Sequence, residues 1–162
     1  MTRTLVVGFG NELRADDGVG LAVVRSLAAA GLPDGVRIAE VGIGGIALLH
    51  ELQAGCDRLV IVDAVRRGGA PGTVYVLTPV LPAPGRALDE HNALADAHFA
   101  EPYAALVLAR SLGVLPADIS VVGIEAAETD ELTTELTPAV ARAVAVAADR
   151  VRRLAAAARE AA

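Results

Sequence analysis

Short runs of β-branched and aliphatic residues alternate along the chain with segments of helical hydrophobic spacing. Such runs, bounded by glycine, proline and polar residues, are typical of strands, and the spacing between them predicts helices. Several runs are apolar at nearly every position, as in strands that are covered on both faces. The pattern predicts five strands, at residues 4–9, 36–41, 58–63, 73–78 and 119–124.

The segments between these strands predict helices on both faces of the sheet. The first is expected to begin near Asp16 and Asp17, whose carboxylates can cap backbone amides at a helix start. Its spacing predicts a buried stripe, formed by Val19, Val23, Leu27 and Ala30. Two further helices are expected at 45–52 and at 102–112. The last begins at Thr137 and Pro138, with a stripe formed by Val140, Val144, Ala147, Val151 and Leu154.

This alternation predicts an α/β fold, a three-layer sandwich whose five-stranded, mostly parallel sheet has helices on both faces. With 162 residues, no repeat and no internal linker, we expect a single domain over residues 1–162. Residues 79–89 have the composition of a surface loop. The uncharged stretch from 68 to 85 is broken by four prolines, so we expect no membrane span.

Composition narrows the function classes. The net charge is −6, and the basic residues are all arginines without a concentrated positive face, so we expect no nucleic-acid partner. The single cysteine, Cys56, allows no internal disulfide and suits the reducing cytoplasm, where we place the protein. Usual protease signatures are also missing: no serine lies in G-x-S-x-G, Cys56 has no local nucleophile signature, and H-E-x-x-H is absent.

The glycine-rich segment 8–20 lies between the first strand and the first helix, where open parallel sheets bind ligands. Gly8 and Gly10 have the spacing of a dinucleotide fingerprint, but its third glycine would stand at Leu13. Asp16 and Asp17 also place negative charge where a pyrophosphate would bind. The case for a P-loop is weaker still, because the sequence has no lysine.

Acids and histidines are the remaining candidates for chemistry. Asp16 and Asp17 are either metal ligands or helix caps, and Asp63 is either a site carboxylate at a strand end or a partner of a neighbouring arginine. His91 and His98 precede the helix expected at 102–112, whereas His50 suits a contact with a helix C-terminus. Imidazole with carboxylates favours a borderline divalent ion such as nickel or zinc.

The segment GFGNELRADDGVG at 8–20 resembles the N-terminal signature of the hydrogenase maturation endopeptidases, which trim the C-terminal tail of the nickel–iron hydrogenase large subunit. VGIGGIALL at 41–49, LVIVDAV at 59–65, VVGIEAAE at 121–128 and LTPAVARAV at 136–144 resemble later segments of that family. The family position before Arg110 to Gly113 falls on His98, which we prefer to His91. Two departures, Asp96 and Ala126, leave the exact substrate open.

The resemblance implies an endopeptidase in which Asp17, Asp63 and His98 are catalytic and hold nickel. The resemblance also implies that the nickel is recognised in the hydrogenase large-subunit precursor and is not stored by the enzyme. The turn at 42–45 would let the substrate backbone approach closely. The peptide bond could be attacked through a metal-polarised carbonyl or by water with a carboxylate base.

Two other functions are compatible with these residues. A metal or precursor chaperone of the same fold would use the same three ligands without cutting. A nucleotide-dependent oxidoreductase would bind NAD tightly.

Overall fold

The computed structural model describes residues 2–81 and 100–157. They form an α/β fold around one five-stranded sheet in the order β2-β1-β3-β5-β4. All five predicted strands are present, and β3 is two residues longer than expected. The strands are β1 (Thr4–Phe9), β2 (Val36–Gly42), β3 (Arg58–Val65), β4 (Val74–Leu77) and β5 (Asp118–Glu125).

The sheet is mixed, which corrects the expectation of a mostly parallel sheet. The β1–β2, β1–β3 and β3–β5 pairings are parallel, but β4 runs antiparallel to β5. The connection from β3 to β4, residues 66–73, is too short for the crossover helix that a parallel return requires. β4 therefore turns back and pairs with the far side of β5.

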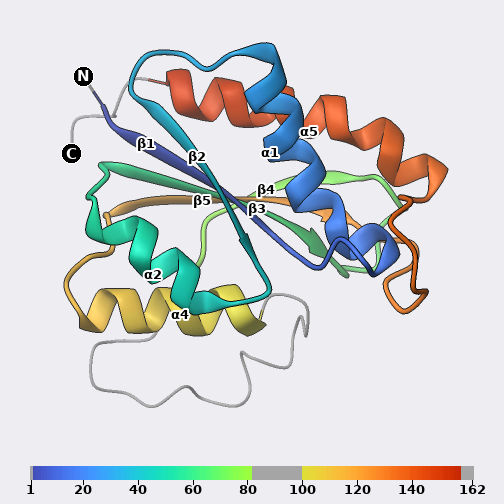
Figure 1. The fold of residues 1–162 in the computed structure, drawn as a ribbon, viewed down its shortest axis with the longest axis horizontal. Helices are drawn as coiled ribbons and strands as arrows, with labels where there is room; N and C mark the ends of the chain where they lie inside the picture. The colour runs from blue at the N-terminus through green and yellow to red at the C-terminus, as the bar shows by residue number, and fades with distance from the viewer. Residues whose placement is uncertain (1, 82–99, 158–162) are drawn as a thin grey trace.

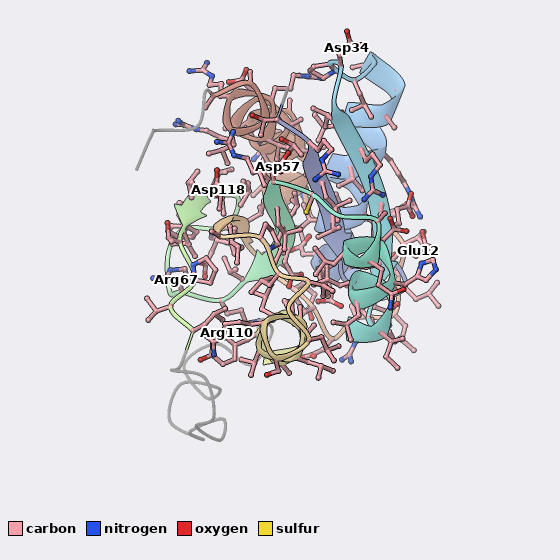
Figure 2. The ribbon with its side chains drawn as sticks, turned by 90° about the vertical axis from the view of Figure 1, so that its left-hand side faces the viewer. Glu12, Asp34, Asp57, Arg67, Arg110 and Asp118 are labelled. Carbon is pink, nitrogen blue, oxygen red and sulfur yellow. The ribbon has the colours of Figure 1, made fainter. Side chains whose placement is uncertain are left out.

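Within residues 2–81 and 100–157, helices cover both faces of the sheet (Figure 1). α1 (Val19–Ala30) and α5 (Pro138–Ala156) pack on one face, and α2 (Gly45–Gln53) and α4 (Ala100–Ser111) pack on the other. Alternate residues of the central strands point into the two cores: Val60 and Val62 face α1 and α5, while Leu59 and Ile61 face the opposite helices. Figure 2 views this layering from the side where Asp57 and Asp118 mark the amino-terminal ends of β3 and β5.

The helices follow the sequence pattern with one error in the first buried stripe. Val19, Val23 and Leu27 are buried, but Ala30, the last residue of α1, is exposed, because the buried part of the helix ends at Leu27. On α5, Val140, Ala147 and Val151 are buried as expected. The surface loop expected at 79–89 lies mostly outside the described residues.

The chain leaves β1 in one direction to β2 and reaches β3 on the other side, so a topological switch point lies between β1 and β3. In open α/β sheets, ligands bind beyond the carboxyl ends of strands at such a point. Within residues 2–81 and 100–157, no helix is long and apolar enough to cross a membrane.

Candidate active site

The loop after β1 carries the first candidate acid to the switch point. It passes through the short 3-10 helix η1 (Ala15–Gly18) directly into α1. A Cβ on Gly20 would lie 2.3 Å from the carbonyl oxygen of Phe9 and 2.4 Å from that of Val62. The first turn of α1 therefore packs directly on the backbones of β1 and β3. Gly20 allows the close approach of helix and strand for which a dinucleotide fingerprint would need a glycine at position 13.

Asp17 stands in η1 and is partly exposed. Its Oδ2 accepts a hydrogen bond of 2.9 Å from the backbone N–H of Asn11, which joins the two ends of the loop. The N-cap of α1 is Gly18, which has no side chain, so the cap expected from Asp16 or Asp17 does not stand at the N-cap position of this helix. The 3-10 turn η1 leads directly into α1. The two carboxylates accept hydrogen bonds from other residues, Asp17 from Asn11 and Asp16 from the segment before α5.

Asp16 is completely buried, with 0% of its surface exposed. Its carboxylate accepts hydrogen bonds from backbone N–H groups in the segment between β5 and α5 and from the hydroxyl of Thr137. Adjacent acids therefore point in different directions: Asp16 into the protein, and Asp17 toward its own loop and partly toward solvent.

Asp63 lies on β3, two residues before the strand ends at Val65, and is 3% exposed. Its Oδ1 accepts a 2.8 Å hydrogen bond from the backbone N–H of Ala64. By strand alternation its side chain shares the sheet face of Ile61, on the side of α2 and α4. Asp17 follows β1 and Asp63 lies near the end of β3, so the structure brings both acids to the carboxyl-terminal edge of neighbouring strands.

The histidine prediction stays open, because His91 and His98 lie outside the described residues. Among residues 2–81 and 100–157, no group of three His, Cys, Asp or Glu side chains is arranged to hold a metal ion. His50 stands in the last turn of α2, where the sequence placed it.

Glu125 is a buried acid that the sequence analysis did not select. It ends β5, is 4% exposed, and accepts hydrogen bonds from the backbone N–H groups of Arg67 and Gly68 at 3.0 Å. Burial, and a hydrogen bond to Glu125, raise the pKa of the Tyr75 hydroxyl. The sequence could have indicated Glu125 by the same criterion that selected Asp63, an acid at the end of an apolar strand. Glu125 ties the loop after β3 to the edge that carries Asp63.

The turn after β2 borders the loop of Asp17. The backbone N–H of Gly10 donates to the carbonyl oxygen of Gly42 at 2.9 Å. Gly42 has a φ of +60°, which favours glycine, but Gly44 has a φ of −114° and no atom within 4 Å of a Cβ built there. Ile43 and Ile46 expose 64% and 81% of their surfaces. Nothing within the described chain requires glycine at position 44.

An arginine on α1 links the loop after β1 to strand β2. Arg25 on α1 donates to both carboxylate oxygens of Glu40 on β2, at 2.9 and 2.7 Å, and to Glu12 in the loop after β1 at 2.7 Å. The hydrogen bonds from Arg25 lower the pKa of the Glu40 carboxyl. Figure 2 shows Glu12 on the flank beside α1 and α2, far from Arg67 on the β4 side.

The one thiol of the chain is remote from this edge. Cys56 precedes β3, whereas Asp63 lies near its end. Burial raises the pKa of the Cys56 thiol, which lowers the fraction of reactive thiolate. The structure thus agrees with the sequence in giving no support to a cysteine nucleophile.

Comparison with known proteins identifies the family. The family model described as hydrogenase maturation protease matches residues 21–153. The chain belongs to this family. The hydrogenase expression/formation protein HupM of Azotobacter chroococcum is 35% identical over 159 residues, covering 90% of this chain and 72% of the relative.

Solved structures agree with this assignment. The [NiFe] hydrogenase maturation protease HybD from Thermococcus kodakarensis superposes with a TM-score of 0.74 at 32% identity, covering 94% of this chain and 99% of that one. The maturating endopeptidase HybD of Escherichia coli gives a TM-score of 0.71 at 30% identity, covering 92% and 89%. The protein is therefore a peptidase of hydrogenase maturation, and the α/β fold expected from the sequence is confirmed.

Proposed function

We propose that this protein removes the C-terminal tail of a nickel–iron hydrogenase large-subunit precursor after the precursor has received nickel. The nickel belongs to the substrate, and Asp17, Asp63 and His98 hold it during recognition. The observation that supports this proposal is the position of Asp17 and Asp63 at the carboxyl-terminal edge of β1 and β3, on either side of the switch point.

The chemistry of these groups suits nickel. Carboxylate and imidazole ligands together favour a borderline divalent ion. The hydrogen bonds from Asn11 to Asp17 and from Ala64 to Asp63 orient the two carboxylates before substrate arrives, as hydrogen-bonded partners commonly do for metal ligands. The same carboxylates are the available bases for attack by water, if the metal does not polarise the carbonyl itself.

The turn after β2 would receive the polypeptide part of the substrate. Gly44 has an ordinary backbone conformation and open space beside it, so its missing side chain leaves room for a backbone from outside the chain. Ile43 and Ile46 expose aliphatic surface at this turn, which an apolar segment of the precursor would cover. The hydrogen bond from Gly10 to Gly42 keeps this turn beside the loop of Asp17.

Recognition of substrate nickel makes cleavage a checkpoint. If the ion contributes part of the binding energy, only a metal-filled precursor is bound and positioned well enough to be cut. Tail removal then follows metal insertion. We propose that this takes place in the cytoplasm, in keeping with the single cysteine, Cys56.

The test compares nickel-loaded and metal-free precursor, each incubated with the purified protein and analysed by mass spectrometry. We expect release of a C-terminal peptide from the loaded precursor only. An intact loaded precursor would contradict the proposal and favour a binding chaperone, and equal cleavage of both forms would remove the nickel checkpoint. Calorimetric titration with NAD is expected to give no heat of binding.

A further inference from the structure

The buried carboxylate of Asp16 links the loop after β1 to the segment between β5 and α5 through four hydrogen bonds. Its Oδ2 accepts hydrogen bonds from the backbone N–H groups of Ala127 and Glu128, at 2.9 and 3.0 Å, and from Thr137 Oγ1 at 2.9 Å. Its Oδ1 accepts a 2.7 Å hydrogen bond from the backbone N–H of Thr137. An ionised carboxylate offers about four acceptor positions, and this one receives four donors, three of them at Oδ2.

The backbone on either side of Asp16 is attached to the same segment. The N–H of Asp16 donates to the carbonyl oxygen of Glu128 at 2.9 Å, and Ala15 and Leu13 pair with Thr133 at 2.9 and 3.1 Å. Figure 1 shows the turn that enters α1 and the connection that enters α5 side by side at one end of the sheet. The loop after β1 is therefore held by residues more than a hundred positions away.

The anchor enforces a backbone that the loop would otherwise avoid. Ala15 has a φ of +44°, in the left-handed region that residues with a Cβ rarely adopt. Such a conformation persists only when its surroundings determine it. Asp17 is the next residue but one, and its N–H donates back to the carbonyl oxygen of Arg14, so the direction of its carboxylate depends on this turn.

We propose that Asp16 is a positioning residue, which fixes the η1 turn against the segment before α5 and thereby aims the carboxylate of Asp17 at the substrate's nickel. This inference rests on the proposed function of Asp17. The buried charge of Asp16 supplies acceptors that no neutral side chain of the same size can match, because an amide would turn an N–H toward a backbone N–H.

The experiment measures kcat and KM on nickel-loaded precursor, at a temperature where every variant is fully folded by circular dichroism. Asp16→Asn is expected to lower kcat/KM at least tenfold per folded molecule. The control is Val151→Ala, which removes buried packing from α5 without touching Asp16 and is expected to stay within twofold of wild type. Equal losses in the two variants, or an unchanged Asp16→Asn enzyme, would overturn the inference.

A milder pair covers the case in which Asp16→Asn does not fold. Thr137→Val removes one of the four donors, and Thr137→Ser restores the hydroxyl. We expect a severalfold loss of kcat/KM in the first and recovery in the second, and the absence of any difference between them would overturn the inference. Asp17→Asn distinguishes a failure of the proposed function from a failure of the positioning role. If Asp17→Asn cleaves normally, the proposed function of Asp17 is wrong. If it is inactive while the Asp16 and Thr137 variants are normal, only the positioning role of Asp16 is wrong.

Discussion

Gly8 of β1 and Gly20 of α1 lie backbone against backbone, so that a Cβ on Gly8 would stand 2.7 Å from the carbonyl oxygen of Gly20. This contact packs the start of the helix directly on the strand. The glycines at both ends of the segment 8–20 therefore have a packing reason that is independent of any nucleotide.

Replacing Gly20 should damage the fold. In Gly20→Ala the new methyl would overlap the carbonyl oxygens of Phe9 and Val62, so we expect a loss of about 3 kcal/mol in the free energy of unfolding. Urea denaturation measures it. Gly44→Ala is the control, because its methyl meets no atom within 4 Å, and its stability should equal wild type. Equal stability of the two variants would contradict the packing described here.

Neutralising either acid should stop the reaction and spare the fold. Asn at position 63 keeps an oxygen that can accept the hydrogen bond from Ala64, so Asp63→Asn should have nearly the melting temperature of wild type. Loss of a charged ligand should lower kcat/KM by at least about 100-fold, and Asp17→Asn should behave alike. A fully active Asp63→Asn enzyme would exclude Asp63 from the site.

The two histidines before α4 give a direct comparison. His98→Ala should abolish cleavage of loaded precursor, whereas His91→Ala should cleave at the wild-type rate, because only His98 is proposed as a ligand. Both variants are assayed by the same release of a C-terminal peptide. An inactive His91 variant beside an active His98 variant would transfer the ligand role to His91.

Exposed aliphatic side chains should contribute to precursor binding only at the carboxyl-terminal edge of the sheet. Ile46, 81% exposed in the first turn of α2, is expected to contact precursor, so Ile46→Ser should raise KM severalfold without lowering stability. Leu112, 60% exposed beyond the end of α4, leads toward the amino-terminal edge, and Leu112→Ser should leave KM unchanged. Steady-state kinetics distinguishes them, and equal KM values for the two variants would argue against docking at this turn.

The pairing of Arg25 with Glu40 predicts a pH dependence of stability. Hydrogen bonds from Arg25 lower the folded-state pKa of Glu40 below its ordinary value of 4.5. The pair therefore stabilises the fold above pH 4.5, and this contribution is lost as the pH falls through the lowered pKa. Because the pair is solvent-exposed, Glu40→Gln should be less stable by only about 0.5 kcal/mol at pH 7.

Unfolding curves for wild type and Glu40→Gln at several pH values test this directly. The difference in free energy of unfolding should shrink as the pH falls below 4.5. A difference that is the same at pH 7 and in acid would assign the effect to packing instead of charge.

Hydrophobic pattern predicted the elements well, because strands and helices each have a local period. The apolar run of β3 and the stripe on α5 are examples. The direction of β4 was missed since it depends on the length of one connection and on the pairing partner, which periodicity does not report. Ala30 was misplaced because helical spacing does not report that the buried part of α1 ends at Leu27, one turn before the helix does.

The site was predictable in part. The position of Asp17 and Asp63 at one edge follows from parallel strands and from where the strands end, both of which the sequence indicates. The role of Asp16 could not be read, because its partners Ala127, Glu128 and Thr137 are distant in the chain and most are backbone groups. Backbone donors leave no signature in residue identity.

The measurement that tests the central claim most directly is anomalous diffraction from crystals soaked with Ni²⁺. We predict one nickel peak at the carboxyl-terminal edge of β1 and β3, with oxygen atoms of Asp17 and Asp63 and a nitrogen of His98 within about 2.3 Å. A peak elsewhere, or carboxylates too far apart to share one ion, would contradict the account.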